Sequence, residues 1–123
     1  MQLRYDNFAE QLRTVVPGFE RVYDEHVSDY DEVLPHVLLG DLVRFLSAEV
    51  ELRGAEALAL KKAIPLLEDA ACSEDERLQE LIVVSFLENL EPDDPSFLAI
   101  RNSFGPGLEE HYRLLRNAED NSQ

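Results

Sequence analysis

Apolar side chains recur at steps of three and four residues along most of the chain, and this spacing is the strongest constraint on its fold. The first such stripe runs from Tyr5 through Phe8 and Leu12 to Val16. Side chains three or four residues apart share one face of an α-helix, so the stripe predicts an amphipathic helix. No segment shows the sustained apolar–polar alternation of a strand, and no Asn-Gly or Asp-Gly pair marks a hairpin. The sequence therefore predicts an all-α protein.

Proline and glycine divide the apolar stripes of the first half into separate helices. Pro17–Gly18 ends the first helix, and a second stripe follows from Phe19 to Tyr30. Leu34–Pro35 interrupts the pattern again, because a residue that precedes proline avoids helical geometry. We expect only a short helical turn at His36–Leu39, and then a separate long helix that is capped by Asp41.

Two longer helices are predicted in the following segment. Residues Ala55–Ala71 have helical spacing, and Pro65 is expected to kink or split that helix. Ser73–Glu76 matches a capping box, in which a serine and a glutamate three residues later satisfy each other's backbone amides. The helix that this box opens extends to Leu90. Apolar residues surround it after Leu81, so we expect it to be central and buried.

The last third of the chain predicts two further helices and a tail. Asp94–Pro95 is a cap followed by a first-turn proline, and Gly105-Pro106-Gly107 separates this short helix from the last one. The result is a compact stack of six to seven antiparallel helices, of which a HEAT-like stack is one version, although no side chains repeat at a fixed period. We expect one domain over residues 1–116 and a frayed C-terminal tail over residues 117–123, which contain no large anchoring side chain.

The charge is strongly negative, at −15 from 26 acidic and 11 basic residues. This balance argues against nucleic acid and anionic membrane surfaces, because both are bound through Lys and Arg. Residues 22–43, 63–76 and 78–100 contain acids and no Lys or Arg. Such stretches either only keep a protein soluble or form a negative face that attracts a basic protein partner. The predicted partner-binding residues are Asp24, Glu25, Asp29, Asp31, Glu32, Glu91, Asp93 and Asp94.

The motifs of common enzymes and cofactor sites are absent from the sequence. We find no phosphate loop, dinucleotide fingerprint, zinc-protease helix or nucleophile elbow. A metal site would need the three histidines, which are His26, His36 and His111. Only Glu32 and His36 have helical ligand spacing, and Pro35 argues against a continuous helix between them. We expect no metal, no cofactor and no catalytic activity.

Cys72 and the N-terminus indicate the cellular compartment of the protein. Cys72 is the only cysteine, so no internal disulfide can form and a reducing compartment is compatible. A helix N-terminus could lower the pKa of its thiol and make it reactive, but we expect Cys72 to be only a small residue at the end of a helix. The N-terminus has no apolar signal core, and no run reaches the ~18–20 apolar residues of a membrane helix. We therefore expect a cytoplasmic protein.

Glu88 and Asn89 stand out because they interrupt an otherwise apolar stretch from Ser85 to Leu90. Helical spacing places Asn89 on the same face as Leu78 and Ile82, so we expect its side chain to point inward. The amide then either bonds backbone groups of a neighbouring helix or belongs to a buried site for recognition or catalysis.

Three short stretches resemble an uncharacterised family of small acidic all-helical bacterial proteins. They are Leu34-Pro35-His36-Val37-Leu38-Leu39-Gly40-Asp41-Leu42, Ser85-Phe86-Leu87-Glu88-Asn89-Leu90 and Phe104-Gly105-Pro106. Proteins of this kind resemble the immunity proteins of toxin systems. The resemblance implies a protein that blocks a cognate toxin domain, often a basic nuclease, by occlusion and charge complementarity. The alternatives are an acidic adaptor or regulatory protein, and a small metal-dependent or acid–base enzyme built on the helix-core carboxylates.

Overall fold

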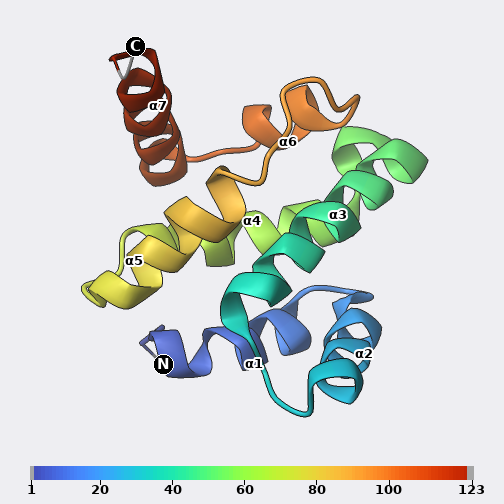
Figure 1. Cartoon of the computed structure of the whole chain (residues 1–123). Coiled ribbons are helices and arrows are strands. Elements are labelled where there is room, and N and C mark those ends of the chain that lie inside the picture. Colours follow the sequence, from blue (N-terminus) through green and yellow to red (C-terminus); the bar gives the residue numbers. More distant parts are fainter. Residues whose placement is uncertain (1, 122–123) are drawn as a thin grey trace.

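The computed structural model describes residues 2–121, with side chains described for residues 2–118, and every regular element in it is helical. The elements are α1 (Tyr5–Val15), α2 (Phe19–Tyr30), α3 (Pro35–Arg53), α4 (Leu58–Ala71), α5 (Glu76–Ile82), α6 (Phe97–Asn102) and α7 (Pro106–Asn121), with a 3₁₀ turn at Gly54–Glu56 and a π-helical turn at Val83–Leu87 (Figure 1). The predicted all-α fold is confirmed. None of these helices has the length and hydropathy needed to cross a bilayer.

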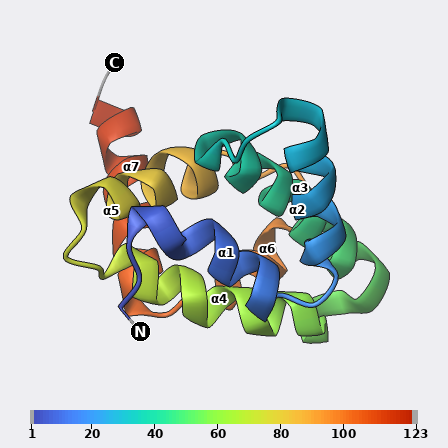
Figure 2. The same ribbon diagram turned by 90° about the horizontal axis from the view of Figure 1, so that it is seen from below.

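The helix formed by α5 and the π-helical turn lies at the centre of the stack. It packs against α1, α3, α4 and α7, with α1 and α2 on one side and α6 and α7 on the other (Figure 1). Figure 2 shows α1 lying along α4, which it also contacts. The predicted burial of this central helix is confirmed, because Leu78, Ile82 and Phe86 have no exposed surface.

Helix α3 differs from its prediction because it is one continuous helix. Pro35 occupies its first turn, where the missing proline N–H would have had no helical partner. Gly40 and Asp41 lie inside the helix, so the predicted separate turn at His36–Leu39 and the predicted cap at Asp41 are wrong. Glycine weakens a helix by about 1 kcal/mol relative to alanine. The complete burial of Leu39 on one side and Leu42 on the other offsets that cost.

Helix α4 also departs from its prediction. It begins at Leu58, after the 3₁₀ turn, and runs through Pro65 to Ala71 without being split. Pro65 is exposed, whereas Ile64 and Leu67 beside it are buried. Burial of these neighbouring side chains stabilises the helix against the hydrogen bond that the proline removes.

The corner between α4 and α5 is held by Asp75 rather than by the predicted capping box. The Asp75 carboxylate accepts a bond from the Arg77 backbone N–H at 3.1 Å, so Asp75 is the cap of α5. Its other oxygen accepts from the Tyr5 backbone N–H at 2.8 Å, at the first residue of α1. Ser73 instead accepts from the Asp75 N–H and donates to the Leu3 carbonyl. One carboxylate therefore caps two helices that are distant in sequence.

Replacing Asp75 with asparagine is expected to remove a pH-dependent part of the stability. The bond from the Tyr5 N–H lowers the pKa of Asp75 below its usual value. A lowered pKa stabilises the fold above the unfolded value of about 3.9, and this contribution disappears as pH falls through the folded pKa. We expect Asp75→Asn to melt below the wild type at pH 7, and the gap to close below about pH 4. Melting temperatures across pH 7 to about 2.5 measure this; a gap that is constant with pH would exclude the carboxylate as its source.

A second carboxylate, that of Glu68 on α4, caps α7. Its two oxygens accept from the Gly105 N–H at 2.9 Å and the Leu108 N–H at 3.0 Å. A Cβ at Gly107 would lie 2.5 Å from one Glu68 oxygen and 2.6 Å from the Cys72 sulfur. Glycine at 107 therefore allows α4 and the start of α7 to approach closely. The predicted break at Gly105–Gly107 is confirmed.

The last two helices differ from their predictions only at their ends. Asp94 accepts both the backbone N–H and the hydroxyl of Ser96, and α6 begins one residue later, at Phe97. Asp94 thus orders the turn before α6, whose cap position is Ser96. Helix α7 reaches Asn121, beyond the start of the tail predicted over residues 117–123, of which 122–123 lie outside the described residues.

Candidate functional site

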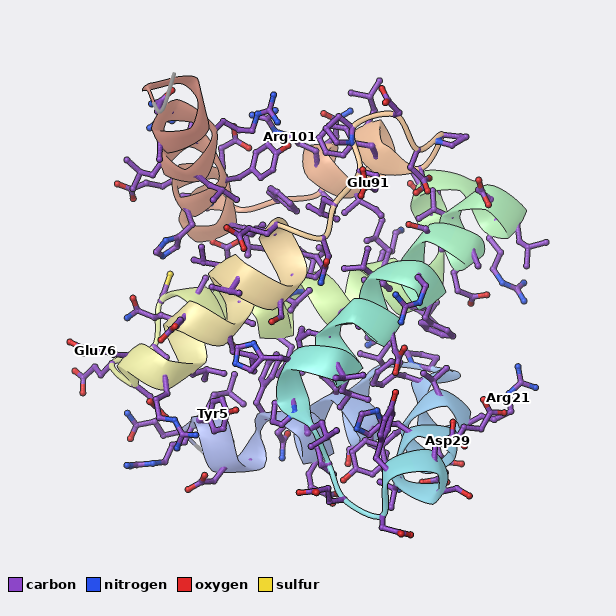
Figure 3. All side chains as sticks on the ribbon, in the orientation of Figure 1. Tyr5, Arg21, Asp29, Glu76, Glu91 and Arg101 are labelled. Carbon is purple, nitrogen blue, oxygen red and sulfur yellow. The ribbon has the colours of Figure 1, made fainter. Side chains whose placement is uncertain are left out.

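A solvent-open hollow of about 380 Å³ lies between one face of α3 and the segment that connects the π-helical turn to α6. Its lining is Gly40, Val43, Arg44, Ser47, Ala48 and Glu51 of α3, with Asn89, Glu91 and Asp94 of the connection. Gly40, Arg44, Ser47 and Glu51 are three or four residues apart, so they share one face of α3. The space exists because the side chains at positions 40, 47 and 48 are small. Figure 3 shows Glu91 on the connection, beside the C-terminal half of α3.

The charge of this hollow, which we call the α3 hollow, is negative. It contains the carboxylates of Glu51, Glu91 and Asp94 and one guanidinium, that of Arg44. Arg44 also forms an ion pair with Asp41 of the same helix. The bond from the Ser96 hydroxyl lowers the pKa of Asp94, so its carboxylate is ionised at neutral pH. The hollow therefore attracts cationic groups.

The structure separates the predicted partner-binding acids into two groups. Glu91 and Asp94 line the α3 hollow, and Asp93 is exposed between them in sequence. The other five, on or just after α2, are exposed, and Figure 3 places Asp29 of α2 far from Glu91. Those five are Asp24, Glu25, Asp29, Asp31 and Glu32.

The α2 group contains one acid that is already paired. Asp24 forms an ion pair with Arg13 at 3.1 Å, so part of the charge of the α2 group is compensated.

The sequence did not predict Glu51 as a site residue, because Arg44 and Arg53 bracket it and the acidic stretches were defined by the absence of basic residues. Its helical spacing from Gly40, Arg44 and Ser47 was the signal that could have identified it.

Asn89 lies at the edge of the α3 hollow and not in the core. It is exposed, as is Glu88, and its amide donates to the Ser85 carbonyl at 2.7 Å. The predicted inward orientation is therefore wrong. The π-helical turn explains the error, because a turn closed by i→i+5 bonds contains an extra residue and rotates all later side chains relative to α-helical spacing.

The three histidines lie in separate environments. His26 is buried and accepts from the Leu34 N–H through Nε2 at 2.9 Å, with its Nδ1 3.5 Å from the nearer Asp41 oxygen. His36 bonds to the hydroxyl of Ser85, and His111 bonds to the Ala71 carbonyl. Among the described residues, no cluster of three or more His, Cys, Asp or Glu residues could hold a metal ion. The absence of a metal from the functional protein stays a prediction.

Comparison with known proteins identifies the family of the chain. No curated protein matches it, and no solved structure does. A family described as "Domain of unknown function (DUF7674)" matches residues 9–118. The match covers nearly the whole described structure, including every residue that lines the α3 hollow. The chain therefore belongs to the DUF7674 family.

Proposed function

We propose that the chain is an immunity protein of a bacterial toxin system, which acts in the cytoplasm by binding a cognate, basic toxin domain. The α3 hollow is the proposed contact point. The observation that supports this proposal is the arrangement of Glu51, Glu91 and Asp94 around a floor of small side chains. Such a floor leaves room for a lysine or arginine side chain of the partner, and the carboxylates neutralise its charge.

The charge of the whole chain supports the same kind of partner. At −15 the chain attracts basic proteins over a distance and repels acidic ones. A toxin domain that acts on nucleic acid needs Lys and Arg to hold phosphate. An acidic protein that covers those residues prevents phosphate from binding, so occlusion requires no turnover.

The proposal is tested by co-expressing the chain with the protein encoded beside its gene. If that neighbour is the toxin, the two proteins co-purify, and the chain relieves the growth arrest that the neighbour causes alone. A stable complex without any effect on toxicity would favour the acidic adaptor or regulatory protein that uses the same hollow. Capture of an acidic partner would contradict the charge-based mechanism.

Charge reversal in the α3 hollow is expected to slow association with that partner. We expect Glu51→Lys combined with Glu91→Lys to lower the association rate about tenfold at low salt, because long-range attraction governs encounter. The effect shrinks as salt rises, since the Debye length is only about 10 Å at 0.1 M. Surface plasmon resonance over a salt series measures both rates.

Two double variants with the same change in net charge complete the test. Glu80→Lys with Glu110→Lys places the change on exposed residues of other helices, outside both acidic groups, and we expect a smaller loss of association rate. Glu25→Lys with Glu32→Lys places it in the α2 group. Equal losses of association rate in all three double variants would mean that only net charge matters. A larger loss in Glu25→Lys with Glu32→Lys would place the interface on α2.

A further inference from the structure

We infer that a second hollow, between α1 and α2, binds a cationic side chain of a partner, a lysine or an arginine. The hollow has a volume of about 330 Å³. Tyr5, Asp6, Ala9 and Glu10 of α1 line it, together with Tyr23 of α2, Val33 of the α2–α3 connection and Pro35 at the start of α3. It shares no lining residue with the α3 hollow. Figure 3 shows Tyr5 at the start of α1, far from Glu91.

The two tyrosine rings of this hollow already attract guanidinium groups within the folded chain. The Arg77 guanidinium lies 3.9 Å from the centroid of the Tyr5 ring, and that of Arg13 lies 5.7 Å from the centroid of the Tyr23 ring. Neither arginine lines the hollow. The face of a tyrosine ring carries negative potential and binds a cation within about 6 Å. These contacts show that both rings attract a guanidinium, and each ring already has an arginine of the chain at one face. Tyr23 is only 7% exposed, so the hollow presents mainly the Tyr5 ring to a further cation.

Two carboxylates add charge to the aromatic walls. Asp6 and Glu10 both line the hollow, and the Tyr23 hydroxyl donates to Glu10 at 3.1 Å. That bond holds the Glu10 carboxylate beside the ring of Tyr23. Within the described part of the chain, no Lys, Arg or His lines the hollow. The apolar stem of a lysine or arginine fits against Ala9 and Pro35, while its charged end reaches the carboxylates.

The same charges decide against other occupants. A neutral apolar group would bury two carboxylates without compensation, which is costly. An anionic group would be repelled, and a second copy of this chain carries a net charge of −15. The combination of tyrosine rings, carboxylates and an apolar floor therefore selects a cationic side chain.

The test is a titration in which a small cationic probe is added to the protein and the resonances of its four tyrosine rings are monitored by NMR. The probe is N-acetyl-arginine amide, and the matched control is N-acetyl-citrulline amide, which has nearly the same shape and no charge. We expect the Tyr5 and Tyr23 resonances to shift saturably with the arginine probe. The citrulline probe is expected to bind at least about fivefold more weakly. Tyr30 and Tyr112 line neither hollow and serve as internal references.

Two variants show whether the hollow is responsible for arginine binding. Glu10→Gln keeps an acceptor for the Tyr23 hydroxyl and removes the charge, so we expect folding to persist and arginine binding to weaken severalfold. Glu110→Gln on α7, which is exposed, removes the same charge elsewhere and should leave binding unchanged. Equal shifts with both probes, or shifts of Tyr30 as large as those of Tyr5, would overturn the inference. The test uses no partner protein, so its outcome is independent of the immunity proposal.

Discussion

Replacing Phe86 with alanine is expected to lower the free energy of unfolding by about 3–5 kcal/mol. Phe86 has no exposed surface and lies in the π-helical turn, which packs between α3 and α7. Its ring centroid is 6.5 Å from that of Phe104, which connects α6 to α7. Truncation removes buried apolar surface and leaves a cavity that rigid neighbouring helices cannot fill. A small domain is stable by only about 5–15 kcal/mol, so this variant approaches complete unfolding.

The matched control is Val84→Ala in the same π-helical turn. Val84 is 41% exposed, so we expect the substitution to cost less than about 1 kcal/mol. Urea denaturation followed by circular dichroism gives both values. Similar losses in the two variants would show that the turn is sensitive to any substitution, and that packing of Phe86 does not dominate its stability.

Replacing Glu68 with alanine is the second large expected effect, about 1–3 kcal/mol of stability. The change leaves the backbone N–H groups of Gly105 and Leu108 without their acceptor and removes a negative charge from the N-terminus of α7. Both N–H groups are in a part-buried region, where water replaces the lost acceptor poorly. Thermal and urea denaturation measure the loss.

Two further variants separate the cap from other effects. Asp69→Ala removes the same charge from the next residue of α4, which is exposed, and should cost much less. Gly107→Ala should destabilise the wild type by crowding both the Glu68 carboxylate and the Cys72 sulfur, and should destabilise less once Glu68 is alanine, because only the Cys72 contact then remains. Additive losses would mean that Gly107 acts independently of the cap.

Local patterns in the sequence predicted most of the helices. The stripe from Tyr5 to Val16, the break at Pro17–Gly18 and the break at Gly105–Gly107 each depend on neighbouring residues only, and the structure confirms all three. The segment from Pro35 to Asp41 gave the opposite result. Pro35 and a cap at Asp41 predicted a short turn and then a separate helix there, but Pro35 fits the first turn of α3, and burial of Leu39 and Leu42 beside Gly40 keeps that helix continuous.

The features that escaped prediction depend on contacts between distant residues. Asp75 caps α1 through Tyr5, and nothing close to either residue in sequence indicates that pairing. The π-helical turn has no distinctive composition, yet it turns Asn89 outward. For the α3 hollow, charge predicted Glu91 and Asp94. Helical spacing could have placed Glu51 on the face of Gly40, Arg44 and Ser47, but only the structure shows that this face of α3 borders the hollow.

The cap on α7 also has a consequence for the order in which the chain becomes structured during synthesis. Gly105, which precedes the first residue of α7, has no side chain that could accept a bond from the helix. The acceptor is Glu68, which is synthesised well before it. A free helix of 16 residues is marginal in water. Glu68 thus leaves the ribosome before α7 does, and α7 gains this acceptor only when it docks against α4.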